Sequence, residues 1–121
     1  MREDAKTILC VDDSPASLGA WIELFDRFGY RTIATTDPQA VVPLLSCVSV
    51  HLAILDYLMP GLDGGTLAAG IRERCPLLPI VLTSNRVADV PAQVRRLVNA
   101  VLPKQDGLAA LLRVVQSLLL S

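Results

Sequence analysis

Aromatic residues and histidine are scarce in this sequence of 121 residues. Aromatic residues make up 4% of the chain, and His51 is its single histidine. Neither histidine, cysteine nor serine forms a pattern that indicates a catalytic triad. His51 opens an apolar run, so we expect it to lie at a strand boundary, without a catalytic role.

An excess of positive charge and a long apolar run are also missing. The formal net charge is −1, so the chain offers no basic surface for a nucleic acid. No apolar run approaches the roughly 20 residues that span a bilayer, and we expect no signal peptide at the start of the chain. We therefore expect a cytoplasmic protein with no nucleic-acid partner and no membrane partner.

The cysteines are few, odd in number and far apart. Cys10, Cys47 and Cys75 have the spacing of neither a metal site nor a disulfide framework. Cys10 lies inside an apolar run, where we expect it to act as a small buried hydrophobic residue.

The chain is rich in short apolar runs that alternate with amphipathic stretches. Its length indicates one domain, residues 1–121, with a substantial core. The alternation predicts an α/β fold with one parallel sheet and helices on both faces. The expected strands are 7–11, 30–34, 51–55, 80–82 and 100–102. The expected helices are 15–28, one that begins at 38 and is interrupted by Pro43, 63–74, 91–98 and 106–120.

Acidic residues stand where two of the expected strands end. Asp12 and Asp13 follow the first apolar run, and Asp56 ends the run 52–55 ahead of the Pro60-Gly61 turn. The carboxyl ends of parallel strands meet at one edge of a sheet, where ligands bind. These acids are either caps of the following loops or a metal site. Three like charges need a cation among them, and oxygen ligands favour Mg²⁺.

Two further strand ends supply a hydroxyl and an ammonium group. Thr83 follows the run 80–82, and Lys104 follows the run 100–102. Carboxylates for Mg²⁺, a nucleophilic carboxylate, a hydroxyl and a lysine together favour phosphoryl transfer.

This ordered set resembles the receiver domain of two-component response regulators. The residues that carry the resemblance are Asp12-Asp13, Asp56 with Met59-Pro60 and Asp63-Gly64 behind it, Thr83-Ser84, and Lys104. The resemblance implies a doubly wound, flavodoxin-like sheet in the order 2-1-3-4-5. It also implies a signalling phosphoacceptor, not an enzyme, whose partners are a histidine kinase or phosphotransfer protein and an unknown output partner.

The resemblance assigns a role to each site residue. Asp56 would accept the phosphoryl group. Asp13, Asp56 and the backbone carbonyl of Leu58 would bind Mg²⁺ directly, and Asp12 would act mainly through water. Lys104 would pair with the phosphoryl oxygens, and Thr83 would move in to hydrogen-bond them.

The chain departs from the family pattern after the last expected strand. The family has Lys-Pro at this point, whereas here Pro103 precedes Lys104 and Gln105 follows it. The family's switch aromatic falls on Val101. We expect a trans Lys104–Gln105 bond, because a cis bond without proline costs about 2.5–4 kcal/mol. We also expect a switch that does not depend on a ring at residue 101.

Two other functions compete with this prediction. One is a receiver-like interaction module that does not use phosphorylation, and the other is a small Mg²⁺-dependent phosphohydrolase. The helix over 15–28 bears two apolar stripes. Trp21, Leu24 and Phe28 form one stripe, and Leu18, Ile22 and Phe25 form the other. Together the stripes are wider than one sheet-facing side needs, so we expect Leu18 and Ile22 to stay partly exposed for partner docking; the alternative is a deeply packed helix.

Overall fold

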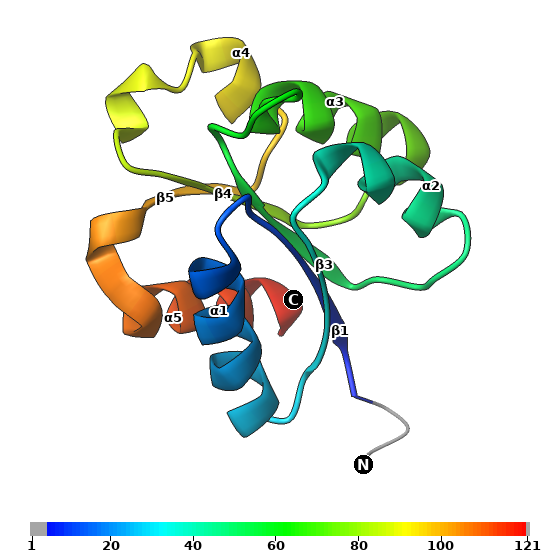
Figure 1. Ribbon diagram of the computed structural model, residues 1–121, viewed down its shortest axis with the longest axis vertical. Helices are drawn as coiled ribbons and strands as arrows, with labels where there is room; N and C mark the ends of the chain where they lie inside the picture. The colour runs from blue at the N-terminus through cyan, green and yellow to red at the C-terminus, as the bar shows by residue number, and fades with distance from the viewer. Residues whose placement is uncertain (1–4, 121) are drawn as a thin grey trace.

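The computed structural model describes residues 5–120 and has five parallel strands in the order β2-β1-β3-β4-β5 (Figure 1). The predicted fold class and strand order are therefore confirmed. The strands are β1 (Thr7–Val11), β2 (Arg31–Thr35), β3 (Leu52–Asp56), β4 (Ile80–Ser84) and β5 (Ala100–Pro103).

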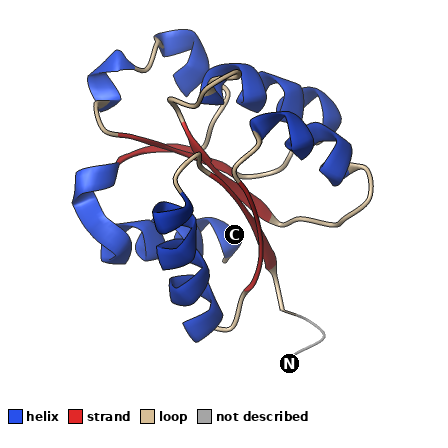
Figure 2. Ribbon diagram, viewed as in Figure 1, coloured by secondary structure: helices blue, strands red, loops and turns tan. Residues whose placement is uncertain are grey.

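The helices cover both faces of the sheet (Figures 1 and 2). Helices α1 (Pro15–Arg27) and α5 (Gly107–Leu119) lie on one face, and α2 (Val41–Leu45), α3 (Gly64–Arg74) and α4 (Ala92–Arg95) lie on the other. Three 3₁₀ turns complete the described chain: η1 (Pro38–Ala40), η2 (Val87–Asp89) and η3 (Lys104–Asp106). None of the helices within residues 5–120 has the length and apolarity needed to cross a membrane.

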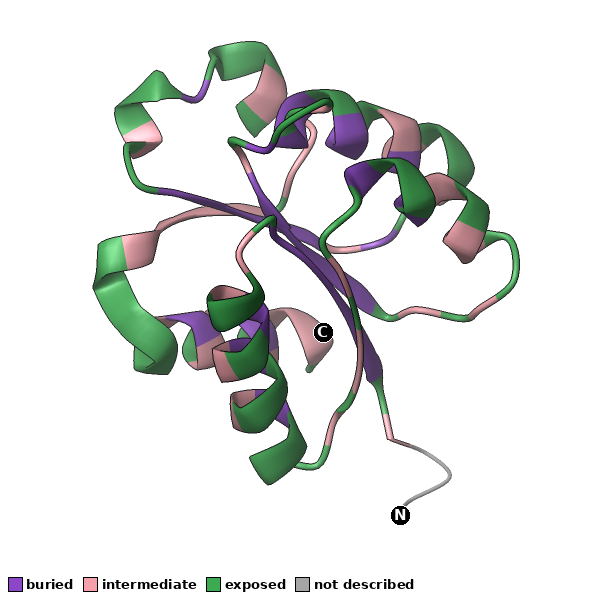
Figure 3. Cartoon of the chain, in the orientation of Figure 1, coloured by how far each residue is buried: buried purple, intermediate pink, exposed green. Residues whose placement is uncertain are grey.

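Strands β1, β3 and β4 are buried along their whole length (Figure 3). Successive side chains point to opposite faces, so each strand supplies both layers of the core. Leu9 and Leu55 join the cluster beneath α2, α3 and α4, whereas Ile8 and Ile54 join the cluster beneath α1 and α5. The edge strand β5 is only partly buried.

The helix boundaries follow the capping signals in the sequence. The Ser14 side chain accepts from the Ser17 amide, and the Asp63 carboxylate accepts from the Thr66 amide. Gly29 lies just beyond α1 with a φ of 87°, a left-handed conformation that glycine adopts without steric cost.

Two helices are shorter than the sequence predicted. The segment that begins at Pro38 is divided into η1 and α2, which places Pro43 in the first turn of α2, where its missing amide is not needed. The helix expected over 91–98 extends only from Ala92 to Arg95, and residues 96–98 form a turn and a bend instead.

The predicted exposure on α1 is confirmed for Ile22 and wrong for Leu18. The residues that pack on the sheet are Leu18, Trp21 and Phe25, each at most 6% exposed, whereas Phe28 is 50% exposed. Both stripes are apolar and spaced for a helix, so periodicity alone could not choose between them. Of the two residues expected to be partly exposed, Ile22 is, at 38%, and Leu18 is buried.

The predictions for Cys10 and His51 agree with the structure. Cys10 is buried in the core, and burial raises the pKa of its thiol to about 12, so the thiolate form is suppressed. His51 is exposed directly before β3, and its Nδ1 accepts a 2.9 Å hydrogen bond from the Thr7 amide. No cis peptide bond occurs among the described residues, so the Lys104–Gln105 bond is trans as predicted.

Arg72 ties three segments together at the edge of the sheet away from the acidic residues. Its guanidinium donates to the carbonyls of Leu97, Pro76 and Leu78 and to Oδ1 of Asn99. The same Asn99 oxygen accepts from the Ile80 amide at the start of β4. Burial lowers the pKa of Arg72, which indicates a partly desolvated charge that depends on these acceptors.

We predict that Arg72→Ala lowers the free energy of unfolding by about 1–3 kcal/mol, because it leaves several carbonyl groups without their donor. Arg27 is the matched control, since its ion pair with Glu23 is largely exposed. Arg27→Ala should change stability by about 0.5 kcal/mol or less. Urea unfolding of the two variants measures both effects, and equal losses would contradict the assignment.

Candidate functional site

The predicted site residues come together at the carboxyl edge of the sheet. Asp12 and Asp13 follow β1, Asp56 ends β3, Thr83 lies near the end of β4, and Lys104 follows β5. The strand register produces this arrangement, since Val11 pairs with Leu55 on the neighbouring strand and Asp56 pairs with Thr83.

Three carboxylates form a compact cluster at this edge. Asp12, Asp13 and Asp56 each offer an oxygen within 4.8 Å of the oxygens of the other two. Asp12 is completely buried, Asp56 is 5% exposed, and Asp13 is exposed to solvent. The cluster therefore has a buried floor and one open side from which a cation could enter.

Lys104 compensates the buried negative charge. Its ammonium lies 2.9 Å from Oδ2 of Asp12 and 3.3 Å from Oδ1 of Asp56. The other Asp12 oxygen accepts from the amide of Ser14 at 2.9 Å. Asp12 thus acts as the loop cap that the sequence allowed, while also belonging to the acidic cluster.

The pKa values reflect crowding of like charges. The net pKa of Asp56 is raised to about 6: burial is the largest cause, the charge on Asp12 adds to it, Lys104 opposes the rise, and Asp13 adds a smaller increase. Burial lowers the pKa of Lys104, but its hydrogen bond to Asp12 and its attraction to both carboxylates outweigh burial, so the net pKa is raised. One lysine does not fully neutralise the cluster.

Thr83 provides a buried hydroxyl beside Asp56. The residue is 3% exposed, and its Oγ1 donates to the Leu55 carbonyl at 3.3 Å. Because that contact is long, the hydroxyl can exchange it for a stronger acceptor at the site.

A comparison with protein families agrees with this geometry. The model of the response regulator receiver domain matches residues 8–116. The chain belongs to this family. The match includes all five site residues and the whole sheet except Thr7, so the acids, hydroxyl and lysine lie within the matched region.

Individual relatives support the same assignment for the receiver domain. The chain is 35% identical over 78 residues to the response regulator protein FleR of Pseudomonas aeruginosa, and the matched region covers 64% of this chain and 16% of FleR. It is 34% identical over 86 residues to the response regulator GtcR of Aneurinibacillus migulanus, covering 70% of this chain and 36% of GtcR. The chain therefore spans a minor part of the length of these relatives.

Solved structures share the fold of the receiver domain. The signal receiver domain of a histidine kinase from Syntrophus aciditrophicus is 27% identical, with a TM-score of 0.81 over 95% of this chain and 90% of that one. The response regulator TrrA of Thermotoga maritima, solved in complex with Mg²⁺ and BeF, has a TM-score of 0.87 at 24% identity, over 93% of this chain and 98% of TrrA.

Gly64 has a structural role in the receiver domain that the sequence reasoning missed. A Cβ atom at this position would lie 2.6 Å from the Asp56 carbonyl oxygen and 2.8 Å from Cα of Tyr57. The Gly64 amide also donates to the Tyr57 carbonyl at 2.7 Å. In the sequence, Gly64 was notable only as part of the Asp63-Gly64 pair that carries the resemblance, whereas in the structure it lets α3 begin directly against the strand that carries Asp56.

Gln105 is the second residue whose contact was missed. Its Nε2 donates to the Asn85 carbonyl at 2.8 Å and so connects the loop after β5 to the loop after β4. In the sequence, Gln105 was notable only as a residue other than proline. No local pattern could identify an acceptor 20 residues away.

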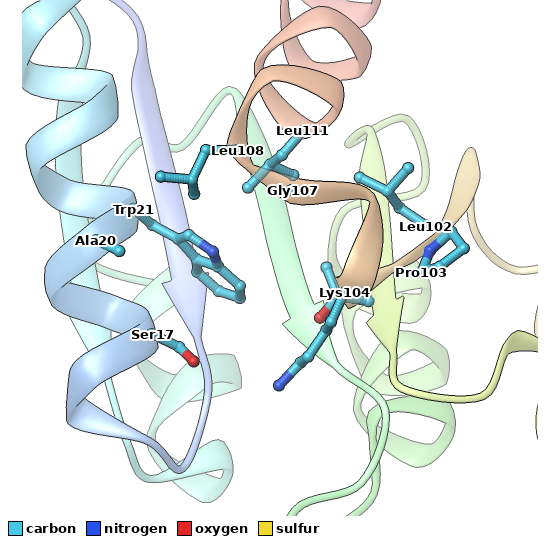
Figure 4. A pocket seen from close by; sticks show the side chains of 10 residues that line it. Ser17, Ala20, Trp21, Leu102, Pro103, Lys104, Gly107, Leu108 and Leu111 are labelled. Atoms are coloured by element: carbon cyan, nitrogen blue, oxygen red, sulfur yellow. The ribbon is translucent and has the colours of Figure 1, made fainter.

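A pocket opens beside the lysine, between α1 and the start of α5 (Figure 4). Trp21 from α1 and Lys104 from η3 project into it, and Thr83 and Leu108 also line it. The side of the acidic cluster nearest the pocket thus has apolar walls.

We predict that Asp13→Asn stabilises the receiver domain in a buffer that contains a metal chelator. The substitution removes an exposed like charge beside Asp56, and the expected gain is about 0.5–1 kcal/mol after solvent screening. Glu73→Gln, a change at an exposed acid of α3 far from the cluster, is the control and should have almost no effect. A loss of stability in Asp13→Asn by thermal unfolding would contradict this account.

Proposed function

We propose that Asp56 of this receiver domain accepts a phosphoryl group from a phosphohistidine on a kinase or phosphotransfer protein. The observation that carries the proposal is the Lys104 ammonium, 3.3 Å from Asp56 and 2.9 Å from Asp12 at the open edge of the sheet. A carboxylate oxygen of Asp56 attacks phosphorus, the P–O bond forms as the P–N bond breaks, and the leaving imidazole nitrogen keeps the electron pair.

The residues present fit a bound Mg²⁺. They offer oxygen ligands alone, the three carboxylates crowd one another, and the cluster is open to solvent at Asp13. In the proposal Asp13, Asp56 and the Leu58 carbonyl hold the ion, and Asp12 contributes through water. When bound, Mg²⁺ supplies positive charge that offsets the charge on the phosphoryl oxygens.

Lys104 and Thr83 complete the proposed phosphoryl site. Lys104 already lies within ion-pair distance of Asp56, so its ammonium can follow the negative charge from the carboxylate to the phosphoryl oxygens. Thr83 exchanges its long contact with the Leu55 carbonyl for a hydrogen bond to a phosphoryl oxygen. The loop that follows Thr83 then moves with it.

The proposed partners are a histidine-containing phosphodonor and an unidentified output partner. The donor is proposed to approach across α1, where Ile22 is 38% exposed, and Leu108 of α5, 42% exposed, lines the nearby pocket. The domain would act as a phosphoacceptor that assists its own phosphorylation and dephosphorylation. The single-domain boundary, the cytoplasmic location and the switch without a ring at Val101 stay predictions.

A receiver-like module that ignores phosphorylation is not favoured. Such a module has no need for a buried acid pair held by a lysine, because burying charge is costly unless the charge has a function or a partner. The retained set of Asp12, Asp13, Asp56, Thr83 and Lys104 supports phosphorylation instead.

We predict that the protein gains one phosphoryl group when it is incubated with acetyl phosphate and Mg²⁺. Asp56→Asn should remove the nucleophile and abolish the gain. Asp89→Asn, a change at an acid in η2 outside the cluster, should leave the gain intact. Intact-mass spectrometry measures both, and an Asp56→Asn protein that is still fully phosphorylated would rule out this acceptor.

We also predict a long-lived phosphoryl group, because Leu58 offers no hydrogen bond to an attacking water. Leu58 is 64% exposed two residues after Asp56. Leu58→Asn should speed the loss of phosphate about three- to tenfold by helping to orient that water. Leu77→Asn is the control, because Leu77 is exposed in the loop between α3 and β4, at the other edge of the sheet. Equal decay of Leu58→Asn and the parent would show that the leucine is not the barrier.

A further inference from the structure

Lys104 is placed by a short turn, not by a regular element. It begins η3, between Pro103 at the end of β5 and Gly107 at the start of α5. Its ammonium nevertheless lies within ion-pair distance of both Asp12 and Asp56. A displacement of about 1 Å in the turn would weaken both contacts, so the turn itself requires support.

Gln105 supplies support from a different segment. Its side chain donates to the Asn85 carbonyl at 2.8 Å, and Asn85 lies two residues after Thr83. The residues just before Asn85 and Lys104 are also neighbours, since Ser84 of β4 pairs with Pro103 of β5. The turn that carries Lys104 and the loop that follows Thr83 are therefore joined first through the strands and then through the Gln105 side chain.

Gly107 gives the turn a point about which it can move. Its φ is 87°, and a Cβ atom added there would meet no atom within 4 Å. The backbone next to the turn is therefore in a conformation that favours glycine, and the space into which a side chain would point is open. A shift of η3 can be absorbed at Gly107 with little disturbance of the rest of α5.

We propose that Gln105 is a positioning residue that couples the Lys104 turn to the Thr83 loop. When Thr83 turns toward the phosphoryl group, the Asn85 carbonyl moves with its loop and draws Gln105 and the Lys104 turn along. The ammonium and the hydroxyl then reach the phosphoryl oxygens together. This role rests on the proposed function, because Gln105 acts through Lys104 and Thr83 and touches no reacting atom.

The chemistry of residue 105 decides whether this connection exists. A glutamine carboxamide has N–H donors, whereas a methionine of similar length has none and a proline has neither the donor nor the reach. Gln93, an exposed glutamine of α4, provides a matched control.

Trp21 provides a built-in reporter for the movement. It is the single tryptophan of the chain, is 6% exposed, and lines the same pocket as Lys104, Thr83 and Gly107 (Figure 4). Its fluorescence should therefore respond when the turn shifts.

The test compares the parent protein with Gln105→Met, Gln105→Arg and Gln93→Met. Each is titrated with beryllofluoride in the presence of Mg²⁺ while Trp21 emission is recorded, and amide shifts are mapped by NMR before and after saturation. Thermal unfolding with a chelator shows whether each variant is folded as stably as the parent.

In the parent, the amides of 83–86 and of 104–108 should shift together. In Gln105→Met the first group should still shift, the second should stay near its free position, and the half-saturating beryllofluoride concentration should rise about three- to tenfold. Gln105→Arg, which restores N–H donors, should recover the joint shift, and Gln93→Met should match the parent.

The outcomes separate this proposal from the function on which it rests. A parent that gives no response contradicts the proposed phosphoryl site, and the role of Gln105 falls with it. A parent that responds alongside an identical Gln105→Met protein overturns the role of Gln105 alone. If Gln105→Met is unfolded, Gln105→Arg decides the matter: a joint shift at parental affinity supports the coupling, and loss of the joint shift in a stable protein overturns it.

Discussion

The ion pair of Lys104 with Asp12 and Asp56 is the contact on which the arrangement of the site depends. Asp12 has no exposure to water, and an uncompensated buried carboxylate would be severely destabilising. The compensating charge comes from 92 residues away in the sequence and from the far side of β4. Only a long side chain can cross that distance, so the sheet order and the lysine are linked requirements. The cluster remains short of positive charge even so, as the raised pKa of Asp56 indicates, and this deficit makes the site receptive to a cation.

Close packing at one strand end provides the second constraint. The scaffold is rigid where β1, β3 and β4 are buried on both faces, but each functional group lies at the point where a strand gives way to a loop. Gly64 lets the start of α3 lie against the backbone of Asp56, where any side chain would collide. Asp63 caps the same helix, which fixes the loop that contains Leu58. The site is thus held by backbone proximity on one side and by the lysine on the other.

The sheet and the acidic cluster could be predicted because their signals are local and periodic. Apolar runs ending in Asp12, Asp56 and Thr83 identify strands, and parallel strands bring their carboxyl ends together whatever lies between them. The contacts of Arg72 and Gln105 could not be predicted, because a side chain that donates to a distant carbonyl leaves no periodic trace in sequence. The burial of Leu18 could not be predicted for a different reason. Two apolar stripes satisfied the helical period, and only the packing of α1 on the sheet selected Leu18, Trp21 and Phe25.

Val101 narrows the ways in which the domain can transmit a signal from its site. The residue is partly buried against the core beneath α4, and a valine has one strongly restricted torsion and no ring to move between two packed positions. We therefore expect any rearrangement of side-chain packing at Val101 to be small. The loop after β4 and the loop after β5 are joined by the Gln105 hydrogen bond, which in our proposal transmits a displacement of the backbone from one loop to the other. Such a connection is exposed to water and of modest strength, so we expect the movement that it carries to stay confined to neighbouring turns. We therefore expect a domain built in this way to present its change around η3 and the pocket beside Trp21, next to the proposed phosphoryl site.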